Sequence, residues 1–229
     1  MSFFERLIGE TRTEREAFIA IPVIQRALRH GVPIEMYLAF LGQAYHHVRH
    51  TCRLLASAAA RCTDADARYI TALLEYIGEE RGHEEWILDD IDALGGDADA
   101  VRNSQPELPC RLLVAYVYYA IEHVSPYAML GMVHVLEGMS AAMATAATAS
   151  LQAALVPADR QGSGRGFSYL SSHGSLDQEH VGFFRDLVDG LGDAAAEQAI
   201  IDTACIVYRL YGDIFRGIDA GFAGVSHAA

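Results

Sequence analysis

Lysine is absent from this sequence of 229 residues, whose 17 basic side chains are all arginines, set against 30 acidic ones. The absence excludes a Schiff-base lysine, the lysine of a phosphate-binding P-loop and an ammonium clamp on phosphate. The net charge is −13, and the arginines form no cluster. We therefore expect neither nucleic acid nor an anionic membrane surface among the partners.

Cysteine is scarce as well. The four cysteines, Cys52, Cys62, Cys110 and Cys205, form no CxxC pair, which argues against a zinc knuckle or a thioredoxin-type motif, so we expect small buried hydrophobic residues. The N-terminal residues include acids and no apolar stretch of signal-peptide length. No apolar run approaches the roughly 18 residues of a membrane span. These absences predict a cytoplasmic protein.

Hydrophobic residues, by contrast, make up 52% of the chain and charged residues only 21%, which is enough apolar material for a substantial core. No linker-like segment divides the chain, so we expect one domain over 1–229. Apolar residues recur at helical spacing, and no stretch shows strand alternation. The pattern predicts an all-α bundle of about seven helices, at 11–29, 34–60, 64–94, 109–123, 125–154, 167–191 and 194–222.

The strongest local motif is HxxxDxxH in SSHGSLDQEHVGFF, formed by His173, Asp177 and His180. On a helix these three side chains lie within roughly 60° of arc. Two imidazoles and one carboxylate on a single face can form one side of a metal site. This ligand set suits iron, manganese or zinc better than calcium.

Two further segments offer donors. Glu80 and His83 form an ExxH pair in YIGEERGHEEWILDDI, a pattern that supplies two ligands from one helix in di-iron bundles. Glu79 is the alternative to Glu80 as the carboxylate ligand that pairs with His83. Glu137 is the only acid in the helix predicted over 125–154, and a carboxylate among apolar residues requires a partner, such as a metal.

Three histidines crowd the segment AYHHVRHT, namely His46, His47 and His50. On a helical projection His47 faces the bundle, whereas His46 and His50 lie on a polar face. Ligation of a metal by His47 and a hydrogen bond within the core remain open alternatives. We expect His134, one turn before Glu137, to lie beside the metal ligands and not among them.

The order of these motifs resembles the haem-oxygenase-like di-metal oxidases, a family of iron-containing redox enzymes related to TenA, thiaminase II and pyrroloquinoline-quinone synthase. The resemblance extends from about residue 43 to residue 180. It implies a seven-helix fold, two Fe(II) ions near the bundle centre, with manganese as the substitute, and O2 as co-substrate. The implied ligands are Glu80, His83, Glu137, His173, Asp177 and His180.

The sequence departs from parts of this superfamily. Several members supply a further glutamate from the segment that here holds His47 or His46. Those that make para-aminobenzoate use a lysine, which is absent. Thiaminase II uses a cysteine after a helix-opening proline, where this chain has Tyr127 after Pro126. Pyrroloquinoline-quinone synthase surrounds its anionic substrate with basic residues, whereas this chain places acids there.

The sequence therefore predicts an O2-dependent oxidase or oxygenase acting on a small molecule. By family analogy the substrate is an amino acid or a carboxylic acid, and a homodimer is left open. The candidates for holding a carboxylate are Arg49, Arg53, Arg81 and Arg165. The aromatic candidates for the pocket wall or a radical relay are Tyr45, Tyr127, Tyr169 and Trp86. Two alternatives are a metal-free cofactor-pathway enzyme and a non-catalytic metal-binding protein.

Overall fold

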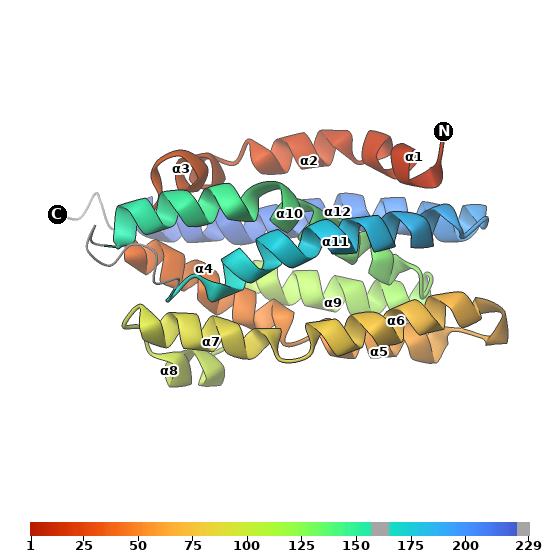
Figure 1. Cartoon of the computed structure of the whole chain (residues 1–229), viewed down its shortest axis with the longest axis horizontal. Helices are drawn as coiled ribbons and strands as arrows, with labels where there is room; N and C mark the ends of the chain where they lie inside the picture. Colours follow the sequence, from red (N-terminus) through yellow and green to blue (C-terminus); the bar gives the residue numbers. More distant parts are fainter. Residues whose placement is uncertain (157–164, 224–229) are drawn as a thin grey trace.

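A computed structural model describes residues 1–156 and 165–223, without the side chains of 173–180. Within these residues the chain forms α-helices and one 3-10 helix, and no strand (Figure 1). The helices are α1 (Phe3–Glu10), α2 (Arg12–Ile19), α3 (Pro22–His30), α4 (Ile34–Val48), α5 (Thr51–Arg61), η1 (Asp64–Asp66), α6 (Ala67–Glu80), α7 (His83–Ala93), α8 (Ala98–Asn103), α9 (Leu108–His123), α10 (Ala128–Leu155), α11 (Ser168–Asp189) and α12 (Ala194–Ala223).

The all-helical fold is confirmed, but the number of seven helices is wrong because three predicted helices are divided. Pro22 opens α3, where its missing N–H costs no hydrogen bond, and so separates α3 from α2. Residues 49 and 50 separate α4 from α5. Gly82, with φ 96°, separates α6 from α7. The chain therefore bends at points where the apolar periodicity alone suggested continuous rods.

Two short helices were not predicted. Helix α1 begins with a capping box, in which Ser2 Oγ accepts from the backbone N–H of Glu5 and Glu5 Oε2 accepts from that of Ser2. Asp97 caps the N-terminus of helix α8, and its side chain accepts from the backbone N–H of Ala100. Both lie within segments that the sequence analysis assigned to no helix.

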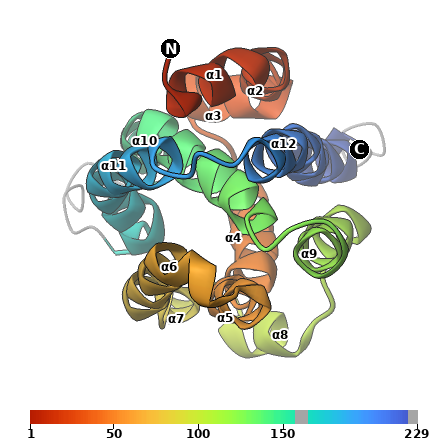
Figure 2. The ribbon, with the colours of Figure 1, turned by 90° about the vertical axis from the view of Figure 1, so that its right-hand side faces the viewer.

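Helices α4 and α10 run through the middle of the bundle, with the other long helices around them (Figure 2). Helix α10 packs against α3, α9, α11 and α12, and α4 packs against α7, α9 and α12. The contact of α10 with α12 is close at Gly131, where a Cβ atom would lie 2.6 Å from the carbonyl oxygen of Ile200. A glycine is therefore needed at this crossing.

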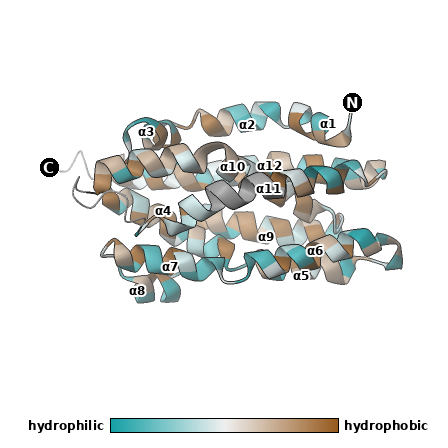
Figure 3. Cartoon of the chain, viewed as in Figure 1, coloured by the Kyte–Doolittle hydropathy of each residue, from teal (hydrophilic) through white to brown (hydrophobic). Residues whose placement is uncertain are grey.

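Helix α10 consists largely of hydrophobic residues, whereas outer helices such as α2, α6 and α7 carry many hydrophilic ones (Figure 3). By length and composition alone α10 could cross a membrane, which corrects the expectation that no segment reaches that threshold. In the fold, 56% of its most apolar window is buried, and the central helix of a globular bundle meets the same criterion.

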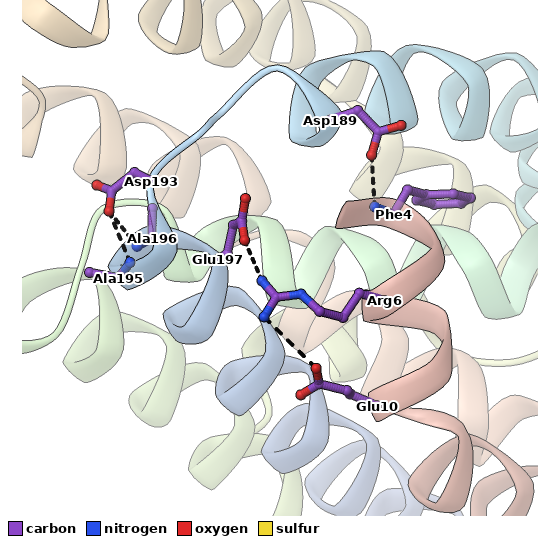
Figure 4. A network of polar contacts seen from close by, with 8 residues as sticks. All are labelled: Phe4, Arg6, Glu10, Asp189, Asp193, Ala195, Ala196 and Glu197. Carbon is purple, nitrogen blue, oxygen red and sulfur yellow. Dashed lines mark hydrogen bonds and ion pairs between the residues drawn. The ribbon is translucent and has the colours of Figure 1, made fainter. Parts of the chain in front are cut away.

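Polar contacts hold the N-terminal helix against α11 and α12 (Figure 4). The backbone N–H of Phe4 donates to Asp189 Oδ1 at 2.7 Å, and Arg6 forms an ion pair with Glu197. Asp193 accepts from two backbone amides at the start of α12. These contacts fix α1 across the adjacent ends of two long helices.

Candidate metal centre

The described residues line a partly open cavity of about 170 Å³ between α3, α4, α10 and α12, called here the central cavity. Most of its wall is aliphatic, aromatic or methionine. Its acidic and imidazole lining residues, among those described, are His47, Glu80 and Glu137. They come from α4, α6 and α10, so three segments far apart in sequence bring these groups to one space.

Glu80 and His83 meet across a turn. Glu80 is the last residue of α6 and His83 the first of α7, and Gly82 between them adopts a left-handed conformation. Oε2 of Glu80 lies 3.2 Å from Nδ1 of His83, and both residues are buried. The imidazole stacks on Trp86, with ring centroids 4.2 Å apart. The expectation that the ExxH pair lies on one continuous helix is therefore wrong.

Glu137 lies beside Tyr76, a buried residue of α6. Burial raises the pKa of the Tyr76 hydroxyl far above its ordinary value, and the nearby carboxylates of Glu137, Glu79 and Glu80 raise it further. Tyr76 also donates a hydrogen bond to Glu137. Of the two rival glutamates, Glu80 lines the central cavity and is buried, whereas Glu79 is exposed. Several carboxylates therefore lie near the buried hydroxyl of Tyr76.

The three histidines of α4 and the following turn point in different directions. His47 lines the central cavity, and its ring meets Tyr211 edge to face. His46 Nε2 lies 2.9 Å from Ser104 Oγ, and His50 Nδ1 lies 3.3 Å from the Tyr118 hydroxyl. Burial is the main cause that lowers the pKa of both His46 and His50. The polar face assigned to His46 is wrong, because only 4% of this residue is exposed.

His134 lies on another side of α10, at a second cavity that Glu137 also lines. Its Nε2 is 3.4 Å from Thr11 Oγ1, and its ring stacks on Phe184. Burial, followed by the charge of Arg15, lowers the pKa of His134 to about 4. Glu137 therefore lies between the central cavity and a neutral imidazole.

The HxxxDxxH motif falls within α11, but the side chains of His173, Asp177 and His180 lie outside the described residues. Helix α11 packs against both α10 and α7, the helices that carry Glu137 and His83. Among the side chains that the structure describes, no three His, Cys, Asp or Glu residues are placed to hold a metal. The ligand set predicted from the sequence therefore stays a prediction.

The sequence matches the model of one protein family, described as iron-containing redox enzymes, over residues 38–212. The chain belongs to this family. No curated protein sequence matches it.

Solved structures resemble the chain over nearly its whole length. A domain of unknown function with a heme oxygenase-like fold, from Shewanella denitrificans, has a TM-score of 0.86 at 18% identity and covers 99% of this chain and 96% of its own. A TenA homologue from P. horikoshii has a TM-score of 0.77 at 12% identity, with 95% and 98% covered. Heme oxygenase-1 from the cyanobacterium Synechocystis, in complex with heme, has a TM-score of 0.74 at 13% identity, with 100% and 97% covered. The chain therefore has the heme oxygenase-like fold.

Of the aromatic candidates, Tyr169 lines the central cavity, and Tyr45 and Tyr127 do not. The Tyr127 hydroxyl donates to Asp66 Oδ1 at 2.7 Å, and its ring stacks on Tyr69. Tyr45 packs edge to face with His46, which likewise lies outside the cavity wall. A direct role for Tyr45 or Tyr127 at this cavity is therefore not supported by their positions.

None of the arginine candidates lines the central cavity. Arg49 lies over the ring of Tyr45, and Arg165 lies near Asp89 and Asp90 at a separate surface pocket. Arg53 and Arg81 are also absent from the described wall. Nothing in the placement of these guanidinium groups supports their binding a carboxylate within the central cavity.

The sequence analysis missed Asp90, a buried residue of α7 that anchors the start of α11. Its Oδ1 accepts from the backbone N–H of Ser168 at 2.9 Å and from Ser168 Oγ at 2.7 Å, and Oδ2 accepts from the backbone N–H of Tyr169 at 2.8 Å. A carboxylate at a helix N-terminus also interacts favourably with the helix dipole. Asp90 thereby fixes the helix that carries HxxxDxxH against α7.

Proposed function

We propose that this member of the family is a non-haem iron oxidase or oxygenase that uses O2 to oxidise a small molecule. The proposed centre holds two Fe(II) ions, with Mn(II) as the alternative metal. Its ligands are Glu80, His83, Glu137, His173, Asp177 and His180, with His47 and Glu79 as further candidates.

The observation that carries this proposal is the placement of two carboxylates, Glu80 and Glu137, and the imidazole of His47 in the wall of a mostly apolar cavity. Buried carboxylates are costly unless a cation or hydrogen-bond donors compensate them. No arginine lines the described part of this cavity, and the chain has no lysine. A metal ion is the ligand that carboxylate and imidazole donors on one wall fit best.

The position of α11 supports the same ligand set. The backbone of this helix lies against α10 and α7, and helical spacing gathers His173, Asp177 and His180 on one face. If that face is directed towards Glu137 and His83, six donors from α6, α7, α10 and α11 surround one space. Such inward-directed donors are how helical bundles build di-iron sites.

Iron bound by these groups would supply the activation of O2, and the remaining steps depend on the chain. The aliphatic and aromatic wall would limit the access of water to the reacting groups. The hydroxyl of Tyr76 donates a hydrogen bond to Glu137 and so fixes the orientation of that carboxylate. The stacking of Trp86 on His83 fixes the imidazole plane in the same way.

Heme is a weaker candidate for this cavity. The heme of the Synechocystis structure shows that the fold can hold this cofactor. Heme carries two propionates, however, and the described wall offers Glu80 and Glu137 in place of cations. A metal-free reaction, as a cofactor-pathway enzyme of the same fold would perform, gives no role to the metal-binding donor types that Glu80, Glu137 and His47 bring to this wall.

Anaerobic titration with Fe(II), using a chelator as competitor, tests the proposal. Wild-type protein should bind close to two equivalents, and His173→Ala and His180→Ala should each lose tight binding at one or both positions. Alanine is the best helix former, so circular dichroism should show that α11 persists. Absence of iron binding by a folded wild type, or unchanged affinity in both variants, would refute the ligand set.

Oxygen consumption separates an enzyme from a protein that only stores metal. The iron-loaded wild type should consume O2 faster when an oxidisable substrate is present than when it is absent. A protein that binds two irons and shows no substrate-dependent O2 consumption across a broad panel would favour the non-catalytic alternative.

A further inference from the structure

The second cavity, which His134 and Glu137 line, lies between the N-terminal helices α1 and α2 and the long helices α10, α11 and α12. It is partly open and has a volume of about 480 Å³. Sites for small molecules typically measure about 300–1,000 Å³. Most of the remaining wall is aliphatic or aromatic, and Phe4 and Phe184 pack edge to face in it. A small molecule with an apolar part therefore fits this space.

Arg15 is the charged residue on the face that the N-terminal helices turn towards this cavity. Phe4 and Ile8 of α1 and Arg15 and Ile19 of α2 line the cavity, and they follow one another at helical spacing. The inward face of such amphipathic helices normally carries apolar residues. A guanidinium at this position is therefore an exception that requires an explanation.

Arg15 also differs from the other half-buried arginines in the part of the chain that the structure describes. Arg6 forms an ion pair with Glu197, and Arg49 lies over the ring of Tyr45. The guanidinium of Arg15 has neither an ion pair nor a ring contact with any described residue. A guanidinium carries five N–H donors and a permanent positive charge. These donors are available to a molecule in the second cavity.

The hydroxyl of Tyr208 is a second polar group without a partner in this wall. Tyr208 lies on α12 and is only 2% exposed, and its hydroxyl oxygen has no hydrogen-bond partner among the described residues. Buried hydroxyl groups normally have one. Burial raises the pKa of this hydroxyl to about 12, and the charge of Arg15 acts in the opposite direction. The guanidinium of Arg15 therefore lies near the Tyr208 hydroxyl.

The polar groups of the wall determine which chemical class fits. A guanidinium pairs with a carboxylate through two parallel hydrogen bonds, and a tyrosine hydroxyl can donate to the same group. One guanidinium offsets a single negative charge, and the apolar part of the wall would leave the hydroxyl groups of a sugar unpaired. A monocarboxylate with a hydrocarbon body is therefore favoured over a phosphate or a sugar.

We propose that the second cavity is a binding site for a small monocarboxylate, whose carboxylate accepts hydrogen bonds from Arg15 and Tyr208 and whose hydrocarbon body contacts the apolar wall. The site depends only on described residues. Glu137 links it to the metal centre, because its negative charge disfavours a second carboxylate in the same cavity and a metal ion bound to Glu137 removes that penalty. This link rests on the proposed function.

The test compares cyclohexanecarboxylate with the neutral cyclohexanecarboxamide by calorimetry on metal-free protein. The carboxylate should bind more tightly, and Arg15→Gln should lower its affinity about tenfold or more, the usual effect of a lost hydrogen bond to a charged group. Tyr208→Phe should lower it by a smaller factor. Arg12→Gln is the matched control, because Arg12 is exposed on the same helix and does not line the cavity. Equal affinity for the two compounds, or an unchanged carboxylate affinity in Arg15→Gln, would overturn the proposal.

Two alanines of α10 distinguish the two cavities. Ala141 lines the second cavity and Ala147 lines the central cavity, and neither lines both. Ala141→Phe should reduce binding of cyclohexanecarboxylate, and Ala141→Leu should do so to a smaller extent with less risk to folding. Ala147→Phe should leave the affinity unchanged. A larger effect of Ala147→Phe than of the Ala141 variants would place the carboxylate in the central cavity and overturn the proposal.

Glu137 and redox-inert Zn(II) separate this proposal from the proposed function. Glu137→Gln should raise the affinity of metal-free protein for cyclohexanecarboxylate, because it removes a like charge from the cavity. Zn(II) should have the same effect on the wild type and little effect on Glu137→Gln. Carboxylate binding that depends on Arg15 and does not respond to Zn(II) would uphold the carboxylate site and refute Glu137 as a metal ligand. Uptake of Zn(II) without any carboxylate binding would uphold the metal centre and overturn the carboxylate site.

Discussion

Oε2 of Glu80 and Nδ1 of His83 lie 3.2 Å apart, although the two residues belong to different helices. Gly82 makes this contact possible, because its φ of 96° interrupts the helix between the end of α6 and the start of α7. No atom would obstruct a Cβ at this position. The geometry of the pair therefore depends on the backbone freedom of one glycine.

Replacing Gly82 isolates that backbone effect. Gly82→Ala should lower the free energy of unfolding by about 1–2 kcal/mol, the cost of a left-handed conformation for a residue with a Cβ. It should also weaken Fe(II) binding by displacing His83 from Glu80. Gly78→Ala is the matched control: Gly78 lies within α6, a Cβ would meet nothing there, and alanine should stabilise the helix by up to about 1 kcal/mol. Urea unfolding that showed equal effects for both variants would contradict this role of Gly82.

Replacing Asp90 should lower the free energy of unfolding more than replacing its neighbour Asp89. Asp90→Ala removes acceptors for three donors at the start of α11, and we expect a loss of about 2–3 kcal/mol. Asp89→Ala is the control, because Asp89 is exposed on the same helix and should change stability by less than about 0.5 kcal/mol. Hydrogen exchange should show faster opening of the first turns of α11 in Asp90→Ala. Unchanged protection there would mean that Asp90 does not anchor the helix.

Glu137 offers a test in which stability and metal binding change in opposite directions. Glu137→Gln keeps an acceptor for the Tyr76 hydroxyl and removes a charge from an apolar interior, so the metal-free protein should gain about 1–3 kcal/mol. The additional stability that Fe(II) gives the wild type should largely disappear, because binding to the folded state alone produces it. Thermal unfolding with and without Fe(II), under anaerobic conditions, measures both. Glu79→Gln should behave like the wild type; if it lost the iron effect and Glu137→Gln kept it, Glu79 would be the ligand.

His134 should make stability depend on pH. Its pKa is about 4 in the folded protein and about 6.5 when unfolded, so the unfolded chain takes up the proton first as the pH falls. The contribution of His134 to the free energy of unfolding is fully present above about pH 6.5. It decreases as the pH falls towards 4, by about 3 kcal/mol at most. Urea unfolding of wild type and His134→Leu across this range isolates the effect. The wild type should lose stability relative to the variant on acidification, and parallel curves would contradict the assignment.

The sequence predicts the fold well because the apolar periodicity of α9, α10, α11 and α12 is long and unambiguous. Their ends agree with the structure within a few residues. The break at Gly82 was not predicted, since a glycine inside an apolar periodicity is compatible with a continuous helix. Periodicity records which face is buried, and it does not record where the helix axis changes direction.

The sequence predicted which residue types lie at the candidate site better than it predicted how these residues are arranged. Glu137, which the sequence singled out as an isolated acid in an apolar helix, lines the central cavity together with Glu80 and His47, and its role as a ligand stays a prediction. The roles of Tyr76 and Asp90 could not be found, because each depends on partners distant in sequence. Tyr127 and Tyr45 were chosen by residue type, and their hydrogen bonding and packing place them elsewhere.

The most direct test of the metal centre is a crystal structure of the protein loaded with Fe(II) without oxygen, with the iron located by anomalous scattering. We predict two peaks between α6, α7, α10 and α11. The ligand atoms should belong to Glu80, His83, Glu137, His173, Asp177 and His180. Iron bound at other residues, or no iron in this space in crystals of a protein saturated with metal, would contradict the account.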